Sequence, residues 1–188
     1  MLTPLHLPAF LTDNWPVWLL SAVLIFAAVI DGLKLKVPNW ITYPLLLAGW
    51  IYSAWQFGWI GLGDSMVGTM VGLGLLLPAY AIGGMGAGDV KLLAGVGAWV
   101  GAVVTLYAFC VSALVGGLIA IGMVLWRHQW RHHAYQFWAI AHEILEVRDP
   151  NALSAIAAER KSRMLLLPYG IPIAIGSIAY FAWAGMLI

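Results

Sequence analysis

Charged residues are scarce in this sequence. Lys, Arg, Asp and Glu together make up 9% of its 188 residues, against about 25% in an ordinary soluble domain, while hydrophobic residues make up 63%. A membrane-spanning helix needs about 20 largely apolar residues, so several crossings fit and little sequence remains for a separate soluble domain. The composition therefore predicts a single integral-membrane domain over residues 1–188.

Cysteine is nearly absent, and there is no large excess of positive charge. The one cysteine, Cys110, cannot form an internal disulfide and offers no paired thiolates for a structural zinc site. The formal net charge is +1, and the basic residues stand in short clusters rather than along one stripe. We expect no metal, no cofactor and no nucleic-acid partner.

Long apolar stretches dominate what is present. One of the five stretches, 92–126, is far longer than one crossing requires and carries Gly95, Gly97 and Gly101. It therefore suits two short helices joined by a tight turn. The sequence thus predicts an all-α, polytopic fold with six transmembrane helices. The stretches are 15–30, 40–60, 65–84, 92–126 and 164–188.

Charge placement predicts the orientation, because Lys and Arg in short loops tend to remain on the cytoplasmic side. With six crossings and an external N-terminus, all nine basic residues lie inside. With five, the six between 127 and 163 would face out. Aromatic and basic residues interleave at the start of 127–163, which predicts a cytosolic interfacial segment in contact with membrane lipids.

Two aspartates carry the candidate chemistry. In the six-helix arrangement Asp31 ends the first helix and Asp89 follows the third, so both lie at the cytoplasmic edge of the membrane. Ionisable groups at such depth are costly, and each aspartate is the best partner for the other. Two carboxylates held close share a proton; one can activate water while the other protonates a peptide carbonyl or amine. This pattern indicates an aspartic peptidase.

Glycines surround the second aspartate. Four glycines stand within the six residues before Asp89, in the segment 83–88. Glycine permits positive φ angles and close backbone approach, so an extended substrate strand could lie against this loop. A plain helix–helix connection explains the glycines equally well.

Two segments resemble the signatures of the type IV prepilin peptidase family. GGMGAGDVKLLAGVGAWVG, around Asp89, is similar to its GxGD segment, and DGLKLKVPNW, from Asp31, is similar to its other signature. LPYGIPIAIG, residues 167–176, resembles the Pro-Tyr/Phe-Gly segment of the family's last helix. The resemblance implies cleavage of a short, basic leader from pilin-like or pseudopilin precursors, before an apolar helical segment, at the cytoplasmic face of the bacterial inner membrane.

The same resemblance implies roles for individual residues. The catalytic pair is Asp31 and Asp89. Lys91 would most simply meet lipid headgroups, and a proline followed by a capping asparagine would start the second helix. The residues expected to bind substrate or shape the site are Gly86, Gly88, Lys91, Pro38, Asn39, Pro168, Tyr169 and Gly170.

The longer members of the family insert a cysteine-bearing cytosolic region and methylate the new N-terminus. Here Cys110 lies inside an apolar stretch, and only a five-residue turn connects Gly32 with Lys36. The resemblance is therefore to the short, peptidase-only branch that serves tight-adherence (Flp-type) pili. N-methyltransferase activity is not expected, and the oligomeric state stays open.

Helix ends suggest which aspartate holds the shared proton. Asp31 lies near the C-terminal end of its helix, where the dipole disfavours negative charge, and Asp89 lies at an N-terminal start, where it is favoured. The hypothesis is that Asp31 holds the proton and Asp89 is ionised, although coupled groups titrate as a pair.

Other patterns compete for the role of active site. Asp64 also completes a GxGD sequence, but it is expected in an external loop or as a helix cap. His142 and Glu143 open like a zinc motif that lacks its second histidine, and His128 with His132 has no cysteine to complete a metal site.

Functions of other classes remain open. Two carboxylates at the membrane edge also suit a proton-coupled transporter or a non-catalytic scaffold of a pilus or secretion system. A transporter would normally place its polar groups near mid-membrane and show paired broken helices. Proteases of the presenilin kind match only in the four-residue GxGD motif.

Overall fold

The computed structural model describes residues 14–81, 84–126 and 168–187. Within these ranges the chain forms four helices and no strand, so the all-α prediction is confirmed. Three of the helices are long and apolar enough to cross a membrane, and the fourth is a shorter apolar helix. The helices are α1 (Trp15–Lys34), α2 (Asn39–Ala81), α3 (Ala87–Trp126) and α6 (Gly170–Trp183).

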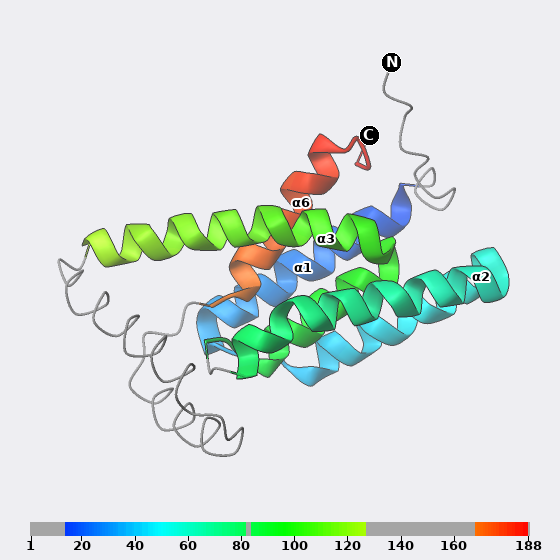
Figure 1. Cartoon of the computed structure of the whole chain (residues 1–188), viewed down its shortest axis with the longest axis horizontal. Helices are drawn as coiled ribbons and strands as arrows, with labels where there is room; N and C mark the ends of the chain where they lie inside the picture. Colours follow the sequence, from blue (N-terminus) through cyan, green and yellow to red (C-terminus); the bar gives the residue numbers. More distant parts are fainter. Residues whose placement is uncertain (1–13, 82–83, 127–167, 188) are drawn as a thin grey trace.

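The two longest helices are each interrupted by one glycine. Gly58 in α2 has φ 62° and ψ −147°, and Gly101 in α3 has φ 74° and ψ 176°. These positive φ angles disfavour residues with a Cβ. At each glycine the helix folds back on itself, as both turns at the right of Figure 1 show. The predicted break of the 92–126 stretch is confirmed at Gly101.

Two boundary predictions need correction. Residues 61–64, expected as a loop, are helical, because the chain reverses at the single residue Gly58. The last apolar stretch, expected over 164–188, is helical from Gly170 to Trp183, and the described residues on either side, 168–169 and 184–187, lie outside that helix. The predicted interfacial segment 127–163, with its histidines, lies outside the described residues.

Small residues allow the second half of α2 to pack directly against the first half of α3. A methyl group on Gly72 would lie 2.8 Å from Ala94 Cα, and one on Gly97 would overlap the backbone of Gly68. Close backbone approach at small residues is the usual basis of helix association in membranes. In addition, Ser65 Oγ donates a hydrogen bond to the Ala98 carbonyl at 2.5 Å.

We expect Gly97→Ala to destabilise this helical hairpin. The added methyl would force the two backbones apart, and such overpacking typically costs about 1–3 kcal/mol. Thermal unfolding in detergent should show a lower Tm. The matched control is Gly63→Ala on the same hairpin, where an added Cβ meets nothing within 4 Å. An unchanged Tm in Gly97→Ala would contradict the close packing.

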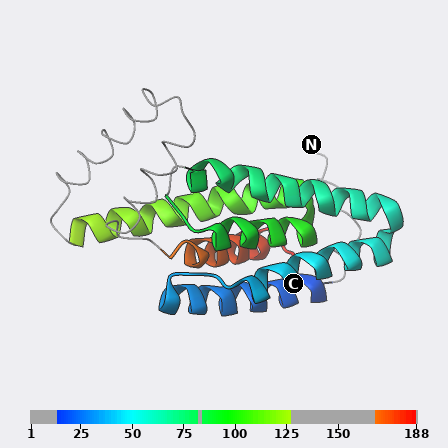
Figure 2. The ribbon, with the colours of Figure 1, turned by 90° about the horizontal axis from the view of Figure 1, so that it is seen from below.

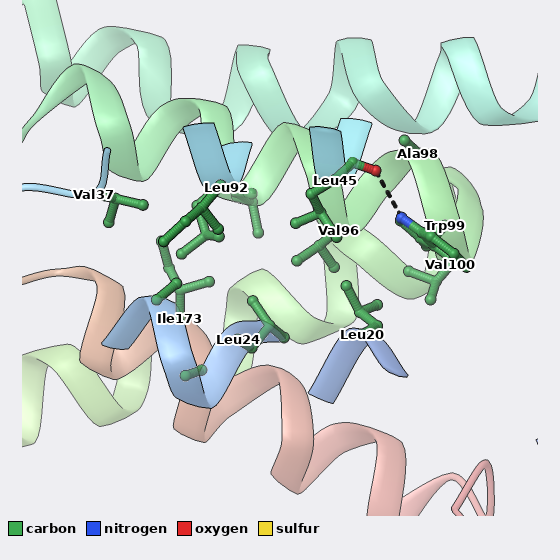
Figure 3. Close-up of a cluster of buried hydrophobic side chains, with 14 of the residues drawn as sticks. Leu20, Leu24, Val37, Leu45, Leu92, Val96, Ala98, Trp99, Val100 and Ile173 are labelled. Carbon is green, nitrogen blue, oxygen red and sulfur yellow. Dashed lines mark hydrogen bonds between the residues drawn. The ribbon is translucent and has the colours of Figure 1, made fainter. Parts of the chain in front are cut away.

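The first half of α3 forms the centre of the core. Every residue from Leu92 to Val100 is buried, as expected for a helix that is apolar on all sides. Figure 3 shows Leu92 and Val96 packed with Leu24 of α1 and Ile173 of α6. This central helix begins two residues before Asp89, so the core positions that carboxylate.

The core also holds the first part of α2 in place. Trp99 Nε1 donates a hydrogen bond to the Leu45 carbonyl at 2.8 Å, drawn as a dashed line in Figure 3. A methyl on Gly49 would lie 2.9 Å from Trp99 Cδ1, so glycine makes room for the indole. These contacts join α2 to the central helix at Trp99, two residues before Gly101.

Candidate active site

Three helix ends meet at one end of the bundle. α1 finishes there, and α3 and α6 both begin there, at the left of Figures 1 and 2. The opposite end is marked by Trp15, whose ring contacts Tyr52 and Trp99 at centroid distances of 5.2 and 6.5 Å. The candidate carboxylates Asp31 and Asp89 lie at the end of the bundle where α1 finishes and where α3 and α6 begin.

Asp31 lies in the last turn of α1 and is bound by the start of α6. Its side chain is only 2% exposed, and its Oδ2 accepts a hydrogen bond from the Gly170 backbone N–H at 2.8 Å. The first N–H groups of a helix have no intrahelical partner, so a carboxylate stabilises that end. A methyl on Gly170 would lie 2.9 Å from the same oxygen and 3.1 Å from Asp31 Cβ. Glycine is therefore required for this approach.

Asp89 is the third residue of α3 and folds back onto the helix start. It is 5% exposed, and its Oδ2 accepts a hydrogen bond from the Gly86 N–H at 3.1 Å. The Asp89 N–H in turn donates to the Gly86 carbonyl at 3.2 Å. An acidic side chain reaching back from the third helical position is half of a capping box. This local bond orients the carboxyl group relative to α3.

The connection between α1 and α2 packs on the glycine before Asp89. A methyl on Gly88 would lie 2.6 Å from the Val37 carbonyl oxygen, and Val37 itself is 2% exposed. Leu35 ends α1 in a left-handed conformation with φ 51°, and its N–H donates to the Asp31 carbonyl at 2.7 Å. This turn directs the chain from Asp31 to the start of α3.

Tyr169 links the surroundings of the two aspartates. Tyr169 precedes Gly170, whose N–H binds Asp31, and the charge of Asp89 affects the pKa of the Tyr169 hydroxyl. Burial raises the pKa of Tyr169, and the negative charge of Asp89 raises it further. The phenol thus keeps its proton at neutral pH and can donate a hydrogen bond. Gly170 therefore binds Asp31, and the charge of Asp89 acts on the neighbouring residue, Tyr169.

Lys91 has partners within the protein. Its Nζ donates hydrogen bonds to Asn39 Oδ1 and to the Tyr43 hydroxyl, each at 3.0 Å, and lies 4.8 Å from the centre of the Tyr43 ring. The expectation that it simply meets headgroups missed these contacts. Asn39 is the first residue of α2 and accepts from Lys91, so the description of it as a helix cap needs correction.

Two further contributors, Tyr43 and Gly116, had no signal in the sequence patterns. Tyr43 stands one turn after Asn39 on α2. A methyl on Gly116 of α3 would lie 3.2 Å from Tyr169 Cε2, so this glycine makes room for the tyrosine ring. Pro168 stands just before the start of α6, and its carbonyl accepts a hydrogen bond from the Ile171 N–H at 3.2 Å. Pro168, Tyr169 and Gly170 thus form the start of α6.

Asp64 lies away from this site. It is exposed on α2 and lines a cavity of about 120 Å³ together with Trp99 and Gly101, at the Trp15 end of the bundle. It is six residues past the Gly58 break, inside a helix rather than in a loop or at a cap. The second GxGD sequence is thus separated from Asp31 and Asp89 by the length of the bundle.

The geometry changes the argument about the shared proton. Asp31 does lie in the last turn of α1, but the N-terminus of α6 also faces its carboxyl group through Gly170. Asp31 and Asp89 therefore both accept hydrogen bonds from N–H groups at helix starts. The dipole of α1 alone no longer distinguishes the two aspartates.

Two comparisons with known proteins agree on one family of leader peptidases. Residues 18–121, more than half of the chain, match the sequence model described as the type IV leader peptidase family. The matched range contains Asp31 and Asp89. No solved structure matches the chain.

Curated relatives share part of the chain and carry the name prepilin leader peptidase/N-methyltransferase. The protein of Aeromonas salmonicida strain A449 is 36% identical over 133 residues, which are 65% of this chain and 44% of the relative. That of Aeromonas hydrophila is 37% identical over 122 residues, 61% and 41% of the two chains. That of Neisseria gonorrhoeae is 35% identical over 112 residues, 56% and 39%. The chain spans less than half the length of the relatives it matches.

Proposed function

The chain belongs to the type IV leader peptidase family, and we propose that it is a membrane aspartic endopeptidase in which Asp31 and Asp89 cleave the leader from pilin-like precursors. The observation that carries this proposal is that Asp31 of α1 and Asp89 of α3 are both buried at the start of α6, where the Gly170 N–H binds Asp31 and the charge of Asp89 acts on Tyr169.

The proposed reaction follows from the pair of carboxylates. The ionised carboxylate takes a proton from water as the water oxygen bonds to the peptide carbonyl carbon. The protonated carboxyl group donates its proton to the carbonyl oxygen, which gives a tetrahedral diol. The carboxyl group that took the water proton then passes it to the amide nitrogen as the C–N bond breaks, and the other carboxylate takes back a proton from a diol oxygen. The products are a free leader carboxylate and a free amine on the trimmed precursor. Hydrogen bonds from Gly86 and Gly170 hold one oxygen of each carboxyl group during these steps.

The substrate class rests on the relatives, which are named prepilin leader peptidases. A test is to co-express the chain with a pilin-like precursor and measure the precursor mass. We expect loss of the leader mass only in cells that contain the enzyme. Unchanged mass with several pilin-like precursors would contradict the proposal and favour a transporter or scaffold.

Six membrane crossings are the topology we propose. Support comes from the fold-back of α2 at Gly58 and of α3 at Gly101, which divides these helices into two segments each. Lys34, Lys36 and Lys91 belong to the end of the bundle that carries the aspartates. By the positive-inside rule that end faces the cytoplasm of a bacterial inner membrane.

Cysteine labelling tests this orientation. In a Cys110→Ser background, we expect Trp59→Cys to react with a membrane-impermeant maleimide in intact spheroplasts. Lys36→Cys should react only after the membrane is permeabilised, because it lies at the opposite end of the bundle. Labelling of Lys36→Cys in intact spheroplasts would place the aspartates on the outer face and overturn the proposed orientation.

We further propose that the chain lacks N-methyltransferase activity. α1 ends at Lys34 and α2 begins at Asn39, so the short turn between them contains no inserted module. Cys110 lies within α3, on an apolar helix. The mass of the trimmed product tests this point: an unmodified N-terminus is expected, and a methylated one would contradict it.

A further inference from the structure

An apolar groove runs between α1 and α6 beside the candidate site. It has a volume of about 680 Å³ and is lined by one face of α1 between Ile25 and Leu33 and one face of α6 between Ile171 and Ala179. The two helices lie side by side in Figure 2. Only apolar side chains and glycine line the groove.

The groove begins at the level of Asp31, although Asp31 itself does not line it. Gly32, in its wall, follows Asp31, and Ile171, in the other wall, follows the Gly170 that binds Asp31. Along α1 the groove runs from Leu33 to Ile25, about 12 Å at 1.5 Å per residue. The groove therefore leads from the level of Asp31 toward the apolar interior of the membrane that surrounds the bundle.

Small residues give the groove its depth. Ala28 and Gly32 of α1 and Ala174 and Ala179 of α6 line it. Small residues at a helix surface let the backbone of another helix approach closely, which is how helices associate in membranes. Larger side chains such as Val29 and Ile175, 55% and 48% exposed, supply apolar contact beside them.

We infer that this groove binds the apolar helical segment that follows the leader of the substrate. The inference rests on the proposed function, because it takes the scissile bond to lie at Asp31 and Asp89. A substrate whose scissile bond lies at Asp31 can continue into the groove, because Gly32 and Ile171 at its end are next in sequence to Asp31 and to the Gly170 that binds it. About eight residues of a substrate helix match the 12 Å length.

A second groove on the other side of α1 provides a comparison. It lies between α1 and α2, has a volume of about 280 Å³ and is lined by residues that include Phe26, Trp40 and Ala48. The rings of Phe26 and Trp40 contact each other there, with centroids 5.8 Å apart. None of its lining residues is adjacent in sequence to Asp31 or Asp89. This α1–α2 groove supplies matched control positions.

Cross-linking tests the inference. In an enzyme with Cys110→Ser and Asp89→Asn, Ile175→Cys is placed in the proposed groove and Ala48→Cys in the control groove. Each is oxidised in membranes with a pilin-like precursor that carries single cysteines along its apolar segment. We expect cross-links to Ile175→Cys that repeat every three to four precursor residues, the period of an α-helix, and none to Ala48→Cys.

Cleavage kinetics give a second readout in the active enzyme. Ala28→Phe narrows the proposed groove and should raise KM for the precursor about tenfold or more, within the range for losing apolar contacts in a binding pocket. Ala48→Phe, the same change in the control groove, should leave KM unchanged.

The outcomes separate the inference from the proposed function. Cleavage by the wild type with cross-links at Ala48→Cys alone would keep the function and overturn the groove assignment. Cleavage without cross-links at either position would assign the groove to lipid chains and also overturn it. If the wild type cleaves no pilin-like precursor, the proposed function fails and the inference fails with it.

Discussion

Asp31→Asn and Asp89→Asn are each expected to lower the rate of precursor cleavage by about 10²–10⁴-fold, the usual contribution of a positioned general acid or base. Asparagine keeps the size of the side chain and can still accept the hydrogen bonds from Gly170 and Gly86. It can neither take a proton from water nor hold one for the substrate. The loss should therefore appear in kcat, measured by the mass of the precursor over time.

Asp64→Asn is the matched control for this prediction. It removes a carboxylate from the other GxGD sequence, at the Trp15 end of the bundle. Cleavage within twofold of the wild type is expected, on the usual scale of an exposed surface substitution. If Asp31→Asn or Asp89→Asn still cleaves at the wild-type rate, the aspartic mechanism is wrong. If Asp64→Asn loses activity as well, the assignment of a single pair fails.

Gly170→Ala should reduce kcat on the order of 10²-fold, because a misplacement of about 1 Å at a reacting group can have that effect. An alanine methyl would lie 2.9 Å from Asp31 Oδ2 and 3.1 Å from Asp31 Cβ, so the carboxyl group must move. The cause would be the position of Asp31 rather than its chemistry. Cleavage kinetics and thermal unfolding should be measured on the same purified protein.

Gly117→Ala on α3 provides the comparison for Gly170→Ala. It adds the same methyl to an exposed glycine with nothing within 4 Å of the new Cβ. Its kcat and Tm should stay at the wild-type values. A Gly170→Ala enzyme with normal kcat would show that the approach of α6 to Asp31 is unimportant for catalysis. A large fall in Tm for Gly170→Ala would instead identify the contact as mainly structural.

The arrangement explains why this end of the bundle is dense in glycine. Gly88 lies against Val37, Gly170 lies against Asp31, and Gly116 lies against Tyr169, and in each case a Cβ would meet the neighbour at 3.2 Å or less. These glycines let the backbone come close to groups from another helix. The helix ends that carry and hold the two carboxylates can therefore approach one another without a gap.

Much of the fold followed from local sequence patterns. Apolar stretches of sufficient length predicted the helices, and the excess length of 92–126 with its glycines predicted the break now seen at Gly101. The alternation of crossings placed Asp31 and Asp89 at one end and Asp64 at the other, as the described helices do. Such predictions succeed because helix length and the avoidance of unpaired backbone groups in lipid act within each segment.

Contacts between distant residues had no such signal in the sequence. The Gly170 N–H bond to Asp31 joins positions 139 residues apart, and Lys91 reaches Asn39 across 52. The left-handed Leu35 and the reversal of α2 at Gly58, without a loop, also escaped prediction. The sequence by itself determined the helices, the break at Gly101 and the end of the bundle to which each aspartate belongs. Only the tertiary structure decided which groups hold the carboxylates, because hydrogen bonds and close approaches between helices depend on how whole elements pack, not on the residues beside them in the chain.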